Sequence, residues 1–181
     1  MNEAIFVRTF DAPRQMVWDA WTKEENLREW FGPTGSQITH AKMDFRVGGS
    51  FHYAMKFGGA TGGGQGDRAT DGKAGTENPE MWGLWTFREI DPPKRLQLVQ
   101  NFSDKDRGIT SHPMAPTWPK KTLSTSTFTE ADGKTTLELH WEPFEATDEE
   151  IATFNAARAN MNEGWSGTFA QLDAYLAKRS K

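Results

Sequence analysis

The end of the chain constrains the fold most, because residues 147–178 have the pattern of one long amphipathic helix. Apolar residues recur at spacings of three and four, which places them on one side of a helix with 3.6 residues per turn. They are Ile151, Phe154, Met161, Trp165, Phe169, Leu172 and Leu176. Thr147 and Glu150 form a capping box at its start. A helix about 45 Å long must bury this stripe against a sheet, and its bulky rings favour a pocket at that junction.

Most of the remaining chain has the pattern of β-strands, with apolar and polar residues in alternation. The segments are 3–10, 41–47, 51–57, 80–90, 94–102, 121–129 and 134–142. Two short helices are expected after the first strand, one from Pro13 and one from a second capping box at Thr22 and Glu25. Because no helix separates the later strands, we predict an α+β fold with an antiparallel sheet of about six to seven strands.

Composition excludes several classes of function. The net charge of −4 and the absence of any basic run argue against nucleic-acid binding, which depends on clustered Lys and Arg. The chain has no cysteine, so disulfides, thiolate metal sites and cysteine nucleophiles are excluded. No apolar run approaches the ~18 residues of a membrane span. We expect a soluble cytoplasmic protein with one domain, residues 1–181.

The chain carries no clear catalytic, metal or cofactor motif. The glycine-rich segment 58–79 joins two predicted strands, whereas a phosphate-binding loop leads from a strand into a helix. The four histidines lack metal-ligand spacing, and Ser166 lies inside the predicted helix rather than on a nucleophile elbow. We expect the helix to pack closely on the sheet at Gly164 and Gly167. We therefore predict no catalytic residue, metal or cofactor.

Two polar residues are candidate anchors for a ligand. Arg158 falls inside the apolar stripe of the predicted helix, where an unpaired guanidinium would be costly to bury. It either extends to solvent, pairs with an acid, or anchors an acidic or carbonyl-bearing ligand. His112, in a second predicted loop over 103–120, is a candidate proton carrier at a pocket mouth.

Four ordered motifs resemble one known family. They are RTFDAPRQMVWDAWTKEENLREWFGP (8–33), DFRVGGSFHYAM (44–55), EIDPPKRL (89–96) and NMNEGWSGTFAQLDAYL (160–176). Together they are similar to homologues of the activator of the heat-shock protein 90 ATPase, within the START-like superfamily, which includes polyketide cyclases. The resemblance implies a helix-grip fold, in which a curved antiparallel sheet wraps around the terminal helix and leaves a deep cavity. The segments 58–79 and 103–120 are longer than the family pattern and are candidate lids.

The resemblance also indicates which residues form the wall of that cavity. They are Phe51, Tyr53, Trp85, Phe102, Met161, Trp165 and Phe169. With the two polar anchors, Trp30 and Trp118 complete the candidate ligand-binding set. The leading hypothesis is a protein that binds a small hydrophobic or amphipathic molecule. The alternatives are a cyclase- or hydrolase-like enzyme using the same cavity, and a stress-response module that binds a chaperone or forms a homodimer.

Overall fold

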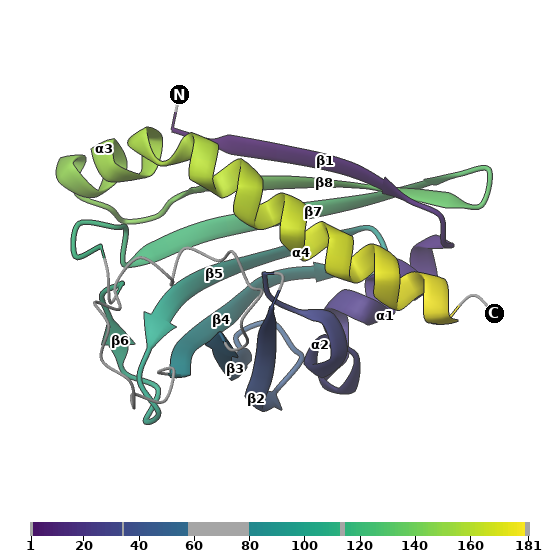
Figure 1. Cartoon of the computed structure of the whole chain (residues 1–181), viewed down its shortest axis with the longest axis horizontal. Helices are drawn as coiled ribbons and strands as arrows, with labels where there is room; N and C mark the ends of the chain where they lie inside the picture. The colour runs from purple at the N-terminus through teal and green to yellow at the C-terminus, as the bar shows by residue number, and fades with distance from the viewer. Residues whose placement is uncertain (1, 34, 58–79, 113–114, 180–181) are drawn as a thin grey trace.

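The computed structural model describes residues 2–33, 35–57, 80–112 and 115–179 (Figure 1). The glycine-rich loop predicted over 58–79 lies outside these residues. The described strands are β1 (Ala4–Phe10), β2 (Ser36–Met43), β3 (Ser50–Phe57), β4 (Glu80–Asp91), β5 (Arg95–Ser103), β6 (Ile109–Thr110), β7 (Lys121–Ala131) and β8 (Lys134–Pro143). The described helices are α1 (Arg14–Thr22), α2 (Glu24–Trp30), α3 (Asp148–Ala156) and α4 (Arg158–Arg179).

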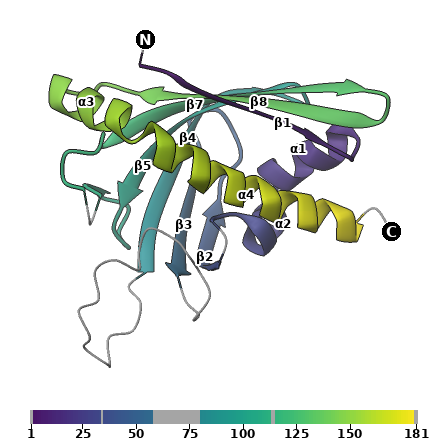
Figure 2. The same cartoon turned by 45° about the horizontal axis from the view of Figure 1, so that its top comes forward.

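The strands form one antiparallel sheet that curves around α4. Their order is β1-β8-β7-β5-β4-β3-β2, with β6 beside β5. Figures 1 and 2 show α4 crossing the concave side of the sheet, with α1 and α2 near its C-terminal end. The predicted α+β fold is confirmed, and β6 brings the described strands to eight. The prediction of one loop over 103–120 is wrong for Ile109 and Thr110, because these two residues pair with β5.

The prediction of a single terminal helix is also wrong, because the helix is interrupted at Ala157. The capping box at Thr147 is present and starts α3. At Ala157 the backbone leaves helical geometry (φ −92°, ψ 8°), and its N–H donates to the carbonyl of Phe154 at 3.2 Å. α4 then begins at Arg158. A one-residue break leaves the apolar spacing almost unchanged, so periodicity alone does not detect it.

Two element boundaries differ from the expectation because side chains take other partners. The hydroxyl of Thr22 donates to the Trp18 carbonyl at 2.7 Å, so Thr22 ends α1 and does not cap α2. The strand predicted over 41–47 runs from 36 to 43 instead. Asp44 donates its N–H to the Ser50 carbonyl at 2.7 Å, and residues 44–49 form the turn.

The helix glycine Gly164 does not mark a close approach to the sheet, contrary to the prediction. It is exposed, and a Cβ built on it would meet no atom within 4 Å. The close approach lies at Gly83 in β4, where a Cβ would stand 2.4 Å from the Tyr53 ring. Gly83 faces Tyr53 directly across β3 and β4.

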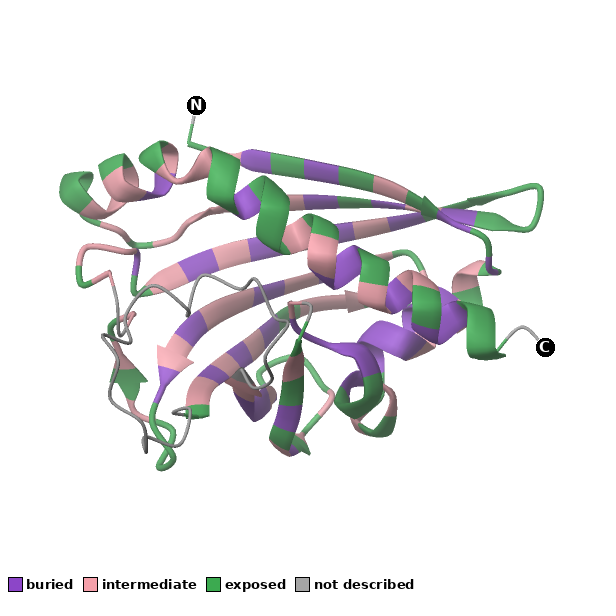
Figure 3. Ribbon diagram, in the orientation of Figure 1, coloured by how far each residue is buried: buried purple, intermediate pink, exposed green. Residues whose placement is uncertain are grey.

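The core lies between the concave sheet face and α1, α2 and α4 (Figure 3). Its aromatic residues form two groups. The α1–α2 cluster contains Trp21, Trp30, Phe31, Phe51, Tyr53 and Trp85. The α3–α4 cluster contains Phe6, Trp118, Trp141, Phe154, Trp165 and Phe169. Ring pairs of this kind contribute about 0.5–1.5 kcal/mol each beyond the area that they bury.

Candidate functional site

The α3–α4 cluster lies where the terminal helices meet the sheet. Trp165 is at its centre, with ring centroids 5.7 Å from Trp141 on β8, 5.9 Å from Phe6 on β1 and 5.5 Å from Phe169 on α4. Trp118 packs on Trp141 at 5.9 Å. Trp118, Trp141 and Trp165 are only partly buried, whereas rings in the α1–α2 cluster are covered. The cluster therefore presents aromatic surface to its surroundings.

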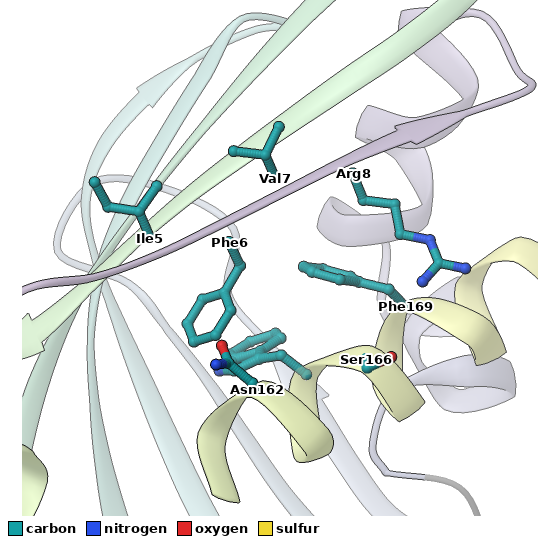
Figure 4. Close-up of a pocket in the computed structure, with 8 residues that line it drawn as sticks. Ile5, Phe6, Val7, Arg8, Asn162, Ser166 and Phe169 are labelled. Atoms are coloured by element: carbon teal, nitrogen blue, oxygen red, sulfur yellow. The ribbon is translucent and has the colours of Figure 1, made fainter. Parts of the chain in front are cut away.

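A groove of about 270 Å³ runs beside this cluster, between β1 and α4 (Figure 4). Its lining residues are Ile5, Phe6, Val7, Arg8, Asn162, Trp165, Ser166 and Phe169. In Figure 4 Phe6 and Arg8 point toward α4, while Ile5 and Val7 lie on the other side of β1. Arg8 forms an ion pair with Asp173 of α4. The groove thus combines apolar rings with uncharged polar side chains and a neutralised ion pair.

Four of the predicted site residues lie in the other cluster, at the α1–α2 end. Phe51 and Trp85 are buried, and Trp30 donates its indole N–H to the Ala20 carbonyl at 2.9 Å. Tyr53 is buried and receives a hydrogen bond from Gln100 at 3.4 Å. Burial raises the pKa of the Tyr53 phenol well above its ordinary value, so this hydroxyl stays protonated. These four residues form a packed end of the core.

Phe102 and His112 lie together at the far end of β5, with their ring centroids 4.9 Å apart. His112 also packs on Trp118 at 6.4 Å, which joins this pair to the α3–α4 cluster. Burial lowers the pKa of His112, so the imidazole is favoured in its neutral form. The structure therefore brings Phe102, His112 and Trp118 together with Trp165 and Phe169.

Arg158 ties the start of α4 to the first strand. Its guanidinium donates to the Glu3 carbonyl at 2.8 Å and to Asn155 Oδ1 at 3.1 Å. These bonds give a partly buried charge one backbone acceptor and one side-chain acceptor. Met161, one turn further on, is buried in the core.

Sequence reasoning left Trp141 and Phe154 out of the predicted site, although both were visible in the patterns. Trp141 continues the alternation of β8, and Phe154 belongs to the apolar stripe of the terminal helix. Both are central to the α3–α4 cluster, with ring centroids 5.4 Å apart. Their periodicity shows that they face the core, but not that they meet the same partners.

The polar candidate residues in the described part of the structure have separate contact partners. Gln100 hydrogen bonds to Tyr53, and Phe102 packs on His112. The guanidinium of Arg158 instead donates to the Glu3 carbonyl. Among these residues no group of three or more His, Asp or Glu side chains is placed to hold a metal ion. No described helix is long and apolar enough to cross a membrane.

A curved antiparallel sheet that holds a long terminal helix defines the helix-grip class of folds. The family model of Activator of Hsp90 ATPase homolog 1-like proteins matches residues 11–177, and the chain belongs to this family. No curated protein matches the chain at a significant level.

Solved structures of similar proteins agree on the fold. A crystal structure of a Mycobacterium smegmatis protein has a TM-score of 0.70 at 22% identity, covering 96% of this chain and 90% of the other. A solution structure from Arthrobacter aurescens has a TM-score of 0.70 at 23% identity, covering 97% and 86%. The AHSA1 protein from Silicibacter pomeroyi has a TM-score of 0.66 at 15% identity, covering 98% and 99%. At these low identities the likeness concerns the fold.

Proposed function

We propose that residues 1–181 act as one START-like domain that binds a small, mainly apolar molecule between the sheet and α4. The proposed contacts come from the α3–α4 cluster and its neighbours. They are Phe102, His112, Trp118, Arg158, Met161, Trp165 and Phe169, with Trp30, Phe51, Tyr53 and Trp85 as the far wall. Family membership supports this role, because the fold is that of a ligand-binding class.

The observation that carries the proposal is the partly exposed aromatic surface beside the groove. Trp165 lines this groove and also contacts Trp141 in the interior. A guest that covers about 100 Å² of apolar surface gains on the order of 2.5 kcal/mol from its removal from water. Aromatic walls with few polar groups are typical of pockets for small apolar molecules.

A fluorescence titration with Nile red, a neutral apolar dye, tests this function. We expect saturable binding that Trp165→Leu weakens, because this change removes aromatic surface from both the groove and the cluster. Trp82→Leu is the matched control, since Trp82 packs on His40 and His52 on the opposite sheet face. Absence of saturable binding, or equal loss in both variants, would refute the proposal.

A cyclase- or hydrolase-like reaction has less support. Such chemistry needs titratable groups that converge on one ligand position. Tyr53 lies in the α1–α2 cluster, whereas Arg158 is bound to the backbone at the opposite end of the core. A binding role requires no such convergence.

A second candidate is contact with a protein partner, either a heat-shock protein 90 or another copy of the chain. Ile5 and Val7 favour it, because they are 50% and 60% exposed on β1, a strand at the edge of the sheet. Exposed apolar residues on an edge strand promote association. Light scattering and pull-down with a heat-shock protein 90 test this role, and Ile5→Lys with Val7→Lys is expected to abolish any complex found.

A further inference from the structure

Three buried hydroxyl side chains on β7 lack hydrogen-bond partners within the described protein. Thr122, Ser124 and Ser126, here called the β7 hydroxyl row, are 3%, 7% and 4% exposed. None of them hydrogen bonds through its side chain to another described residue. Among the described residues, the fully enclosed side-chain atoms without a partner are the indole nitrogens of Trp21, Trp85 and Trp141, so the hydroxyl oxygens of the row keep some accessible surface. A hydroxyl that gives up water gains stability only when it finds another hydrogen-bond partner.

The contrast with the other buried hydroxyls shows that the row is exceptional. Thr22, Thr135 and Thr168 each donate to a backbone carbonyl, at 2.7, 2.8 and 3.0 Å. Ser103 donates to the Asp104 carbonyl at 2.9 Å. These hydroxyls are satisfied by the fold itself, so the row on β7 is available to a different partner.

The row faces the concave side of the sheet, under the α3–α4 cluster. Phe128, two residues after Ser126 on the same strand face, packs on Trp18 of α1 inside the core. Ser124 lies directly opposite Trp141 on β8, and Trp141 contacts Trp165 of α4. The row is therefore next to the aromatic residues of the proposed ligand site.

The surroundings of the row add a polar donor but no charge. The buried indole N–H of Trp141 hydrogen bonds to no other described residue. The other cross-strand neighbours of Ser124 and Ser126 are Leu96, Leu98 and Leu139, and Thr122 faces Gln100 and Pro143. A carboxylate, phosphate or ammonium buried here would have no opposite charge among these neighbours, which makes its desolvation costly.

We infer that the ligand carries a neutral hydroxyl or carbonyl group on an apolar body, and that this group hydrogen bonds to the β7 hydroxyl row. The inference rests on the proposed function and specifies the chemical class of the ligand. The row supplies donors and acceptors, the Trp141 indole supplies a donor, and the rings of the α3–α4 cluster cover the apolar body. The row thus favours a neutral polar group over both a charged group and a plain hydrocarbon.

Displacement of Nile red by three matched compounds tests the inference: naphthalene, 2-naphthol and 2-naphthoate. The naphthol hydroxyl favours water, so tighter binding than naphthalene requires hydrogen bonds in the site. We expect 2-naphthol to bind about tenfold more tightly than naphthalene, as buried hydrogen bonds allow. We expect 2-naphthoate to bind more weakly than either.

A double variant assigns the preference to the row. Ser124→Ala with Ser126→Ala should reduce the preference for 2-naphthol over naphthalene to about twofold or less. Thr127→Ala, on the opposite face of β7, is the control and should retain the preference. Equal wild-type affinities for 2-naphthol and naphthalene, or a preference that survives the double variant, would overturn the inference alone. If the dye itself does not bind, so that displacement cannot occur, the proposed function fails together with the inference.

Discussion

The contact between Gly83 and Tyr53 leads to a stability prediction whose sign depends on the background. Gly83→Ala places a Cβ 2.4 Å from Cζ and from the hydroxyl oxygen of Tyr53. The ring cannot move away easily, because Phe31 and Phe51 pack on it at 5.3 and 5.1 Å. Overpacking of this kind costs about 1–3 kcal/mol. We expect the melting temperature to fall by about 2–4 °C for each kcal/mol lost.

In a Tyr53→Ala background the same change should become neutral or stabilising. Without the ring the clash is gone, and alanine avoids about 0.5–1 kcal/mol of the backbone entropy cost of glycine. Tyr53→Ala itself costs about 3–5 kcal/mol, by analogy with other buried aromatic residues. The double-mutant cycle should therefore give a coupling of about 1.5–4 kcal/mol.

Urea denaturation of the four proteins in the cycle measures this coupling. Gly164→Ala is the matched control, because its Cβ meets open space on the exposed side of α4 and alanine is favoured in helices by up to about 1 kcal/mol. A Gly83→Ala variant as stable as the wild type, or an equal loss with and without Tyr53, would show that the ring does not require a glycine opposite it.

Three further predictions concern the terminal helices and the outer sheet face. Phe154→Ala should lower the free energy of unfolding by about 3–5 kcal/mol in urea denaturation, because the ring is fully buried; a loss below about 1 kcal/mol would contradict its packing on Trp141. Thr147→Ala should cost about 1 kcal/mol by the same assay through loss of the capping box, and Thr147→Ser should retain most of it. Hydrogen bonds to Glu138 and Glu3 raise the pKa of His140 above 6.5, so its contribution to stability is complete below pH 6.5 and lost as the pH rises through the folded-state pKa. The stability difference between wild type and His140→Gln should shrink over that rise, and a difference that grew with pH would contradict the charged pairing.

The pattern of residues along the chain was sufficient to predict the class of fold. Alternation in 121–129 and 134–142 identified two paired strands, and the capping box at Thr147 marked where the terminal helices begin. These signals are local, since a strand or helix face repeats every two or 3.6 residues whatever it packs against. The interruption of the helix at Ala157 was not predicted, because it alters hydrogen bonds without altering the apolar spacing.

The composition of the candidate site depended on tertiary contacts. The predicted rings all face inward, yet Trp85 packs with Trp21 at one end of the core and Trp165 packs with Trp141 at the other. Periodicity indicates which face of an element is buried, but it does not indicate which part of the opposite element that face meets.

Strand β7 shows most clearly which features follow from the sequence and which follow from tertiary packing. Each face of this strand carries one large apolar residue, Leu123 on one and Phe128 on the other, so alternation does not decide its orientation. Thr122, Ser124 and Ser126 are more deeply buried than Leu123. Phe128 fixes this orientation by packing on Trp18, because residues two apart on a strand share a face. The sequence by itself determined that a strand forms here, and only the packing of the sheet against the helices decided that its hydroxyl groups point inward.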